Sequence, residues 1–253
     1  MSSSPGPIRL ESKRVPRPWG GEIWFLPRQG ELPLLVKFIY THQALSYQVH
    51  PDDEYAARRH NCRGKTEMWY VAAAELGAKI GLGFNRAVTK DHLREAALSG
   101  AMESLLNWVS PRSGESYFTP AGTIHAIGAG VQLWEVQENS DITYRLFDYG
   151  RGRELHLDDG LNVISTAPFN AAPVPLPLRT PWFCVDKLDA SAEAFTYRPD
   201  AEKYHLIICV TGEGSIAGEP FRSGEVWMVP AASAPFDLKR SPGAELLRAA
   251  GPA

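Results

Sequence analysis

The sequence predicts an all-β fold, a sandwich or barrel built from short strands. Turn-forming residues recur at short intervals, with 22 Gly and 20 Pro in 253 residues, and brief runs rich in Val, Ile, Phe, Trp and Tyr lie between them. A pattern of glycine and proline also occurs once in each half of the chain. The chain is long enough for two β domains, and this internal repeat favours two related domains over one.

The first half contains most of the strand signals. Residues 1–14, MSSSPGPIRLESKR, are rich in Ser, Pro and Gly and lack the order of a secretory signal, so we expect a flexible tail. The first domain is then expected to span residues 15–167. Its candidate strands are 34–40, 45–50, 67–72, 78–82, 115–118, 131–137 and 141–146.

One segment of this domain departs from the strand pattern. In residues 89–108, TKDHLREAALSGAMESLLNW, apolar residues recur at helical spacing. Thr89 is a suitable N-cap, and Ser99 with Gly100 breaks the pattern. We therefore predict two short helices inserted into the β domain.

A proline-rich connector and a second domain follow. Residues 168–181, PFNAAPVPLPLRTP, carry five prolines, which remove backbone donors and favour extended chain outside a sheet. Strand signals return at 182–188, 204–210, 214–217 and 225–229, so residues 182–253 are predicted to form the second domain.

The internal repeat indicates which domain carries the chemistry. The run GESYFTPAGTIH, which ends at His125, has the form Gly-x5-Pro-x-Gly-x2-His, and GEVWMVP, which ends at Pro230, repeats its first seven positions. In the second copy Ala232 replaces the second glycine and Pro235 replaces the histidine. The second domain is therefore expected to be degenerate and to lack metal ligands.

Composition excludes several classes of protein. With 44% hydrophobic residues, 22% charged residues and a formal net charge of −3, the chain is typical of an ordinary globular protein and not of a nucleic-acid-binding one. No apolar run is long enough to span a membrane. Cys62, Cys184 and Cys209 are widely spaced, which argues against a disulfide framework and a thiolate zinc site and favours the cytoplasm. Whether the protein is a monomer or a dimer is left open.

Four polar residues of the first domain have the chemistry of metal ligands. Gln48 and His50 lie two apart in a predicted strand and so project to the same side, Glu67 starts the next strand, and His125 follows a Pro-Ala-Gly turn. Imidazoles, a carboxylate and an amide oxygen suit zinc or another first-row ion. Alone, His50 would be a strand-end histidine bonded to Asp52 or Asp53, but the joint occurrence of the four favours a metal site.

Longer motifs carry a family resemblance. The stretches LSYQVHPDDEYA (45–56), GKTEMWYV (64–71), PAGTIHAIGAG (120–130) and QENSDITYRLFDYGR (137–151) occur in this order. In these motifs the sequence resembles the type I mannose-6-phosphate isomerases, zinc enzymes of the cupin superfamily, in their short bacterial form. The resemblance implies tandem cupin jelly rolls, that is, double-stranded β-helix barrels, with a short helical insertion.

The resemblance also implies roles for individual residues. It assigns Gln48, His50, Glu67 and His125 as ligands of one zinc ion per chain, and Lys65 and Arg145 as active-site residues. Two departures stand out: Gly64 occupies a position where some members carry a histidine, and the helical domain of longer members is reduced to residues 89–108.

The implied reaction interconverts mannose 6-phosphate and fructose 6-phosphate by moving a proton between C1 and C2 through an enediol. Glu135 and Asp141 are both candidates for the base, and the sequence does not choose between them. Lys65 would stabilise a developing enolate oxygen, or it is a surface lysine of a hairpin.

The phosphate of such a substrate needs fixed positive charge. Arg145 is the first candidate for binding it and Arg151 the second, because an arginine fork suits a phosphate group. Strand periodicity would put Asp141, Thr143 and Arg145 on one face. Alternatively, Arg151 and Arg153 are a solvated pair beside Glu154.

Two rival functions fit parts of the same pattern. A cupin oxygenase would use iron bound by two histidines and one carboxylate. A sugar-phosphate-binding protein would keep the cavity without turnover. In every case the expected partner is a small molecule, with no nucleic acid and no membrane.

Overall fold

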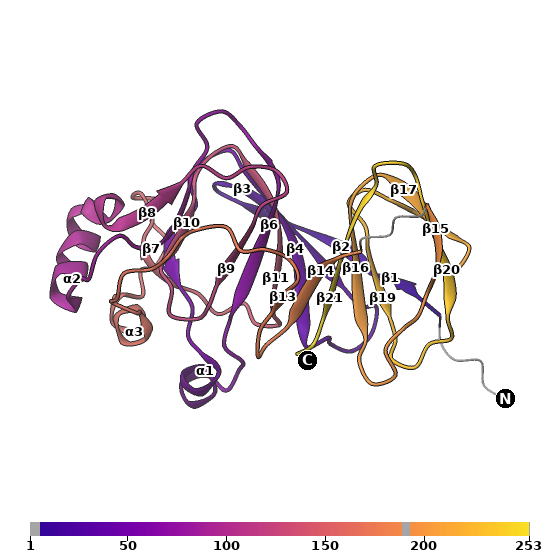
Figure 1. Ribbon diagram of the computed structural model, residues 1–253. Helices are drawn as coiled ribbons and strands as arrows, with labels where there is room; N and C mark the ends of the chain where they lie inside the picture. Colours follow the sequence, from indigo (N-terminus) through magenta and orange to yellow (C-terminus); the bar gives the residue numbers. More distant parts are fainter. Residues whose placement is uncertain (1–5, 189–192, 253) are drawn as a thin grey trace. The chain divides into compact units, whose positions relative to one another are not determined.

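The computed structural model describes residues 6–188 and 193–252, and β-strands predominate in them, as predicted (Figure 1). The chain divides into two compact units. The first barrel comprises residues 14–23 and 37–174, and the second barrel comprises the residues before Arg14, residues 24–36 and the residues from Pro175 onward. Residues 24–36, which the sequence placed in the first domain, thus belong to the second, and the boundary falls inside the predicted connector.

The N-terminal segment corrects the prediction of a flexible tail. Residues 8–9 and 11–14 of that predicted tail lie in strands: β1 (Ile8–Arg9) pairs with β19 (Val226–Val229), and β2 (Glu11–Arg17) begins one residue later. The physical reason is edge pairing: backbone groups of β1 bond to β19, and Arg9 pairs with Glu225 at 3.0 Å. Residues 1–5 of the predicted tail lie outside the described residues.

Two sheets form the first barrel. One has the strand order β12-β5-β10-β7-β8, and the other has the order β2-β3-β4-β11-β6-β9, although residues 11–13, 24–26 and 34–36 of β2, β3 and β4 are counted with the second unit. Buried side chains of both sheets, among them Trp69, Leu133 and Leu82, pack into a core between them. The further strands of these sheets are β3 (Gly20–Leu26), β4 (Leu34–Thr41), β5 (Tyr47–Val49), β6 (Glu67–Ala74), β7 (Ile80–Phe84), β8 (Leu106–Val109), β9 (Ser116–Thr119), β10 (His125–Ile127), β11 (Val131–Glu138) and β12 (Tyr144–Phe147).

Helices cover the outer face of the five-stranded sheet. As predicted, Thr89 caps α2 (Lys90–Ser99) by accepting the backbone N–H of His92, and Gly100 ends the helix in a left-handed conformation. The 3-10 helix η1 (Ala101–Leu105) follows, but residues 106–108 of the predicted helical segment belong to β8. The sequence missed α1 (Asp53–His60) and α3 (Leu157–Val163), of which α3 lies beside α2 in Figure 1.

The second barrel also consists of two sheets with a core between them. Their strand orders are β1-β19-β16-β21-β14-β13 and β15-β20-β17-β18, and Ile207, Phe221 and Leu238 are among the buried residues that join them. The remaining bounds are β13 (Leu178–Arg179), β14 (Cys184–Lys187), β15 (Ala194–Tyr197), β16 (His205–Thr211), β17 (Glu213–Ile216), β18 (Glu219–Arg222), β20 (Phe236–Arg240) and β21 (Glu245–Ala250). In the described part of the chain, no helix has the length and hydropathy needed to cross a bilayer.

Candidate metal centre

Neighbouring strands of the five-stranded sheet place three polar side chains in one row. Gln48 of β5 lies opposite His125 of β10 on one side and opposite Arg145 of β12 on the other. Directly opposed residues of antiparallel strands project to the same face of the sheet. Three segments that are far apart in the sequence therefore present their side chains to one side of the barrel.

The facing sheet contributes two buried carboxylates. Glu67 opens β6, and Glu135 of β11 lies opposite Trp69 of β6. The indole Nε1 of Trp69 donates to Glu67 Oε1 at 3.1 Å and to Glu135 Oε2 at 3.2 Å. A single donor thus fixes the orientation of both carboxylates.

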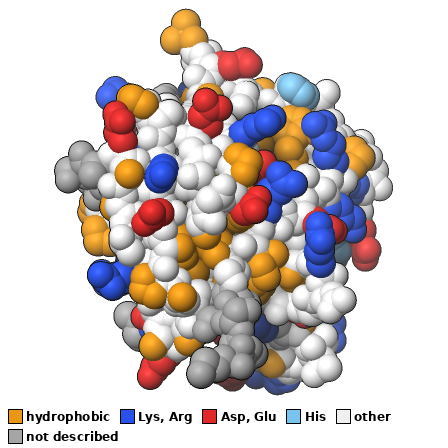
Figure 2. All heavy atoms as spheres, turned by 90° about the vertical axis from the view of Figure 1, so that its right-hand side faces the viewer, with side chains coloured by type: hydrophobic (Ala, Val, Ile, Leu, Met, Phe, Trp, Pro, Cys, Tyr) orange, Lys and Arg blue, Asp and Glu red, His pale blue; other side chains and the backbone are white. Residues whose placement is uncertain are grey.

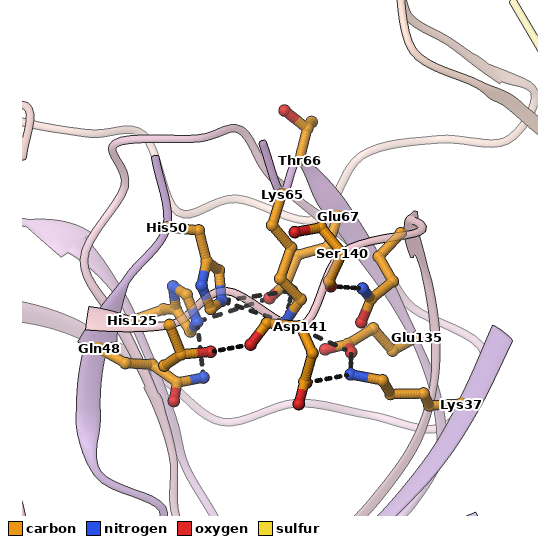
Figure 3. Close-up of polar contacts among 12 residues, drawn as sticks. Lys37, Gln48, His50, Lys65, Thr66, Glu67, His125, Glu135, Ser140 and Asp141 are labelled. Atoms are coloured by element: carbon orange, nitrogen blue, oxygen red, sulfur yellow. Dashed lines mark hydrogen bonds and ion pairs between the residues drawn. The ribbon is translucent and has the colours of Figure 1, made fainter. Parts of the chain in front are cut away.

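His50, Glu67 and His125 converge on a common point (Figure 3). One ligand atom from each lies within 4.8 Å of the others, and all three side chains are fully buried. His50 Nε2 is 3.6 Å from Glu67 Oε2, and His125 Nε2 is 3.5 Å from Glu67 Oε1. These three of the four predicted ligands form a candidate metal centre.

Backbone carbonyls orient the two imidazoles. His50 Nδ1 lies 2.8 Å from the carbonyl oxygen of Ile142, and His125 Nδ1 lies 2.9 Å from that of Thr123. A proton on each Nδ1 leaves the lone pair of Nε2 directed at the centre, as metal-binding histidines require. Burial, with the charge of Lys65, lowers the pKa of both rings, that of His125 to about 4, so both are neutral near pH 7.

The turn before β10 connects the ligands through the backbone. Gly122 adopts a left-handed conformation with φ of +82°, and its N–H donates to the carbonyl oxygen of His50 at 2.8 Å. A glycine adopts this conformation at little cost. The Pro-Ala-Gly turn therefore holds the chain just before His125 against His50 at the end of β5.

The donor set fits a divalent ion. Glu67 Oε2 is buried and receives no well-directed hydrogen bond, although the Lys65 ammonium lies 2.7 Å away. Two imidazole nitrogens and a carboxylate are the ligands of many zinc sites, with a position left for water or substrate. Gln48 completes the set only after its amide is turned, because its Nε2, and not its oxygen, lies 3.1 Å from His125 Nε2.

Two buried lysines surround Glu135. Lys37 and Lys65 are both almost fully buried and lie 3.6 Å and 3.7 Å from Glu135 Oε1. Burial alone would lower the pKa of Lys65, but attraction to Glu135 and Glu67 outweighs burial and raises it. Burial and repulsion from Glu67 raise the pKa of Glu135, whereas the two ammonium groups oppose that rise.

A polar cavity of about 170 Å³ opens beside these groups. Gln48, Lys65, Glu135, Asp141, Thr143 and Arg145 line it, so it gathers most of the residues that the sequence singled out. The strand β12 begins only at Tyr144, and Asp141 and Thr143 reach the cavity from the loop before it. The remaining residues of the lining are Arg17, Trp19, Glu22, Lys37, Ile39, Leu45, Ser46, Ile127 and Arg153.

Arg145 keeps hydrogen-bonding capacity inside this cavity. Its Nη1 donates to the carbonyl oxygen of Glu154 at 2.8 Å, while its buried Nε has no partner. Burial and the charge of Arg153 lower its pKa, although a guanidinium stays protonated near neutral pH. An unsatisfied buried donor is costly, so this N–H favours an acceptor that enters from outside.

Arg151 and Arg153 have different surroundings. Arg151 donates to Asp148 at 3.2 Å and to the carbonyl oxygen of Ala44, and it is not among the residues that line the cavity. Arg153 also pairs with Asp148, but it does line the cavity. The solvated pair beside Glu154 that the sequence offered as an alternative is instead a partly buried cluster around Asp148.

The backbone explains the glycine at position 64. A Cβ at Gly64 would lie 2.4 Å from the carbonyl carbon of Asp52 and 2.5 Å from the nitrogen of Asp53. The Gly64 N–H also donates to Asp53 Oδ1 at 2.8 Å. The start of α1 therefore leaves no room for a histidine at this position.

Sequence reasoning missed Lys37. Lys37 stands in the otherwise apolar run of β4, LLVKFIYT, and is 2% exposed. A charged residue at an inward position of such a strand is itself the signal, because an isolated buried charge is costly unless it is paired. The paired carboxylates, Glu135 and Asp141, come from elements that the local pattern does not connect to β4.

Curated relatives resemble the chain over most of its length, although no protein-family model matches it. It is 34% identical over 211 residues to the mannose-6-phosphate isomerase of Streptococcus mutans serotype c, covering 77% of this chain and 66% of that protein. It is 36% identical over 230 residues to mannose-6-phosphate isomerase ManA of Bacillus subtilis strain 168, covering 82% of this chain and 72% of that protein. The chain thus spans about two thirds of the streptococcal relative.

Solved structures show the same fold. A mannose 6-phosphate isomerase from Bacillus subtilis superposes with a TM-score of 0.85 at 24% identity, over 97% of this chain and 99% of that one. A variant of the phosphomannose isomerase from Salmonella typhimurium gives a TM-score of 0.77 at 16% identity, over 98% and 100% of the two chains. This likeness confirms the predicted cupin fold.

Proposed function

The chain belongs to the mannose-6-phosphate isomerase family, and we propose that it interconverts mannose 6-phosphate and fructose 6-phosphate as a zinc-dependent isomerase. One observation carries the proposal: the His50, Glu67 and His125 cluster lies beside a cavity that also receives Lys65 and Arg145. The cavity therefore combines a set of metal ligands with fixed positive charge for an anionic sugar. All three cysteines are free thiols, which agrees with a reaction in the cytoplasm.

The metal would be held by His50, Glu67 and His125, with Gln48 as fourth ligand after rotation of its amide. When bound, zinc would polarise the carbonyl and hydroxyl oxygens of the open-chain sugar. The protein supports such an ion through the Nδ1 contacts that orient both imidazoles and through Trp69, which fixes Glu67.

We assign the transfer of the proton between C1 and C2 to Glu135 rather than to Asp141. Glu135 is buried beside the cavity with its Oε1 free of a hydrogen-bond partner, whereas the side chain of Asp141 is about half exposed. Burial raises the pKa of Glu135, which brings a carboxyl group closer to the range that suits a general base. Asp141, paired with Lys37 at 3.4 Å, helps to hold that lysine in place.

Lys65 and Arg145 have separate tasks in this proposal. Lys65 keeps its proton, because two carboxylates raise its pKa, and it stabilises negative charge that develops on a substrate oxygen in the enediol. Arg145 binds the phosphate through its unsatisfied Nε, and Arg153 adds positive charge to the same cavity. Arg151 contributes indirectly, by fixing Asp148 and with it Arg153.

A coupled assay on protein of measured metal content tests the proposal. Fructose 6-phosphate formed from mannose 6-phosphate is followed with zinc-loaded protein, with metal-depleted protein and with protein reloaded with zinc. We expect turnover that follows the zinc content. No turnover in fully loaded protein would reject the isomerase and leave a binding protein, and oxygen uptake with iron-loaded protein would favour an oxygenase.

A further inference from the structure

The second barrel contains a cavity of its own. Its volume is about 430 Å³, within the range of small-molecule sites, and it is lined by residues of β13, β14, β16 and β21 and of the loop before β16. Four of the lining side chains are arginine or lysine: Arg179, Arg198, Lys203 and Arg248. The degenerate domain therefore has a basic cavity that its sequence did not reveal.

This cavity lies where the first barrel has its metal centre. The order β3-β4-β11-β6-β9 in the first barrel corresponds to β13-β14-β21-β16-β19 in the second. Glu67 lies opposite Thr119, the residue before the proline of the first Gly-x5-Pro run. His205 lies opposite Val229, the residue before the proline of the second run. His205 therefore occupies the strand position of the metal ligand Glu67.

The same register relates the next pair of residues. Glu135 lies opposite Trp69, two residues after Glu67. Arg248 lies opposite Ile207, two residues after His205. Arg248 thus occupies the position of Glu135, and a positive charge replaces a negative one.

The ion-pair partner on the neighbouring strand also has the opposite charge in the two barrels. In the first barrel Lys37 of β4 pairs with Glu135 of β11 at 3.6 Å. In the second barrel Asp186 of β14 pairs with Arg248 of β21, with Nη2 to Oδ2 at 2.5 Å. The strands that surround a cation site in one barrel therefore carry the reverse arrangement in the other.

Positive charge in the second cavity is not fully compensated. Asp186 is bound by Arg248, and Asp200 accepts the backbone N–H groups of Glu202 and Lys203. Among the residues that the structure describes, Arg179 and Arg198 make neither an ion pair nor a side-chain hydrogen bond, and the Lys203 ammonium contacts a neutral carbonyl, that of Pro252. The lining thus carries more positive than negative charge: Arg179 and Arg198 form no ion pair with a carboxylate of the described residues, although the carboxylate of Asp200 also lines the cavity.

A small anion suits this arrangement better than an extended polyanion. On the face drawn in Figure 2, Lys and Arg side chains gather toward the right-hand side, but Asp and Glu side chains stand among them. The net charge of the chain is −3. Such a surface does not favour a nucleic acid, whereas guanidinium groups around a cavity match the geometry of a phosphate group.

We propose that the cavity of the second barrel binds the phosphate group of a small ligand, separately from the centre in the first barrel. Arg179 and Arg198 supply forked N–H donors, Lys203 adds an ammonium group, and Arg248 forms the floor while it stays bound to Asp186. This site does not depend on the proposed isomerase activity, since none of its residues belongs to the first barrel.

Calorimetric titration with inorganic phosphate tests the proposal. The wild-type protein, the double variant Arg179→Ala/Arg198→Ala and the variant Arg145→Ala are compared at low ionic strength. We expect the double variant to bind phosphate at the second-barrel site at least about tenfold more weakly, because two charged donors are lost. Binding to that site should persist in Arg145→Ala, and it should weaken as salt is added.

Matched controls separate the possible outcomes. Arg222→Ala removes an exposed arginine of the same barrel that does not line the cavity, and it should bind phosphate like the wild type. Unchanged phosphate affinity and stoichiometry in the double variant would overturn the proposal, as would loss of all binding in Arg145→Ala. Mannose 6-phosphate and unphosphorylated mannose identify the source of the affinity: a phosphate site binds the first and not the second.

Retained isomerase turnover in the double variant shows that the first barrel is intact. Failure of the second site is thereby distinguished from failure of the proposed function.

Discussion

The two barrels share a strand order and differ in what their corresponding positions bury. Around one end of the first barrel lie Glu67 and Glu135, two carboxylates held by lysines and an indole. The same positions of the second barrel carry His205 and Arg248. Corresponding positions of the two barrels thus carry side chains of different charge, Glu67 and Glu135 in the first barrel and His205 and Arg248 in the second.

The turns of the two barrels, by contrast, resemble each other. Gly122 has φ of +82°, and Ala232, at the corresponding place after the second Gly-x5-Pro run, has φ of +56°. The left-handed turn is therefore present in both barrels, although Pro235 stands where the first barrel has His125, a proposed metal ligand. The backbone geometry is similar although the imidazole is absent.

We expect the largest fall in activity when one of the proposed metal ligands is removed from the first barrel. His125→Ala removes an imidazole whose Nε2 faces Glu67, and we expect kcat/KM to fall by about 10³-fold or more together with the bound metal. Metal content by mass spectrometry and the coupled assay measure both. His205→Ala, at the corresponding end of the second barrel, should keep its metal content. Full zinc occupancy in His125→Ala would refute the ligand assignment.

A second prediction concerns Lys37, one of the two buried lysines of the first barrel. Lys37→Met removes one of the charges that oppose the rise in the pKa of Glu135, so that pKa should rise further. A smaller fraction of Glu135 is then ionised near neutral pH, and the acidic limb of the pH–rate profile should move to higher pH. We expect activity at pH 7 to fall by up to about tenfold for each unit by which the pKa of the base rises, because the ionised fraction of the base falls by that factor.

The exposed Lys90 of α2 provides the matched control for this prediction. Lys90→Met should leave the pH–rate profile unchanged. An acidic limb that stays in place in Lys37→Met would mean that Glu135 is not the group whose ionisation controls the rate.

A smaller effect is expected when the guanidinium of Arg145 is exchanged for an ammonium group. Arg145→Lys keeps the charge but loses the Nε–H that has no partner in the protein. KM for mannose 6-phosphate should rise by about tenfold, with a smaller change in kcat, because the phosphate is remote from the reacting carbons. Steady-state kinetics measure the two constants separately. A fall in kcat at constant KM would place Arg145 at the reacting atoms instead.

How much of this arrangement the sequence predicts depends on the kind of signal. Many buried strands of both barrels were predicted because apolar runs bounded by Gly and Pro are a local pattern, and β16, HLIICVT, is an example. The largely buried strands β3, β10 and β21 were not predicted. The strand β2, ESKRVPR, was missed because its residues are mostly exposed and charged. The helix α1 was missed because it buries only Ala56, although Asp52 as N-cap and Asn61 as C-cap mark its ends.

Of the candidate metal centre, the sequence predicted some features and missed others. Three of the four residues predicted to be ligands lie together, because each stands at the end of a strand or beside a turn whose position the register determines. The pairing of Lys37 with Glu135 and the charge inversion in the second barrel were beyond the sequence pattern. Both depend on which strands are neighbours, and that information comes from the fold.

The smallest expected effect concerns the two turns themselves. Ala232 is exposed and holds a left-handed conformation that costs a non-glycine residue about 1 kcal/mol, so Ala232→Gly should stabilise the second barrel by up to about that amount. Gly122→Ala should destabilise the first barrel by more, because it adds the same strain and a Cβ 3.0 Å from the carbonyl oxygen of Val163. Denaturant unfolding of both variants measures the two changes in free energy. Changes in the free energy of unfolding that are equal in size and opposite in sign would mean that only the left-handed conformation matters. An unchanged free energy of unfolding in Ala232→Gly would show that the extra freedom of glycine in the unfolded chain cancels the relief of strain.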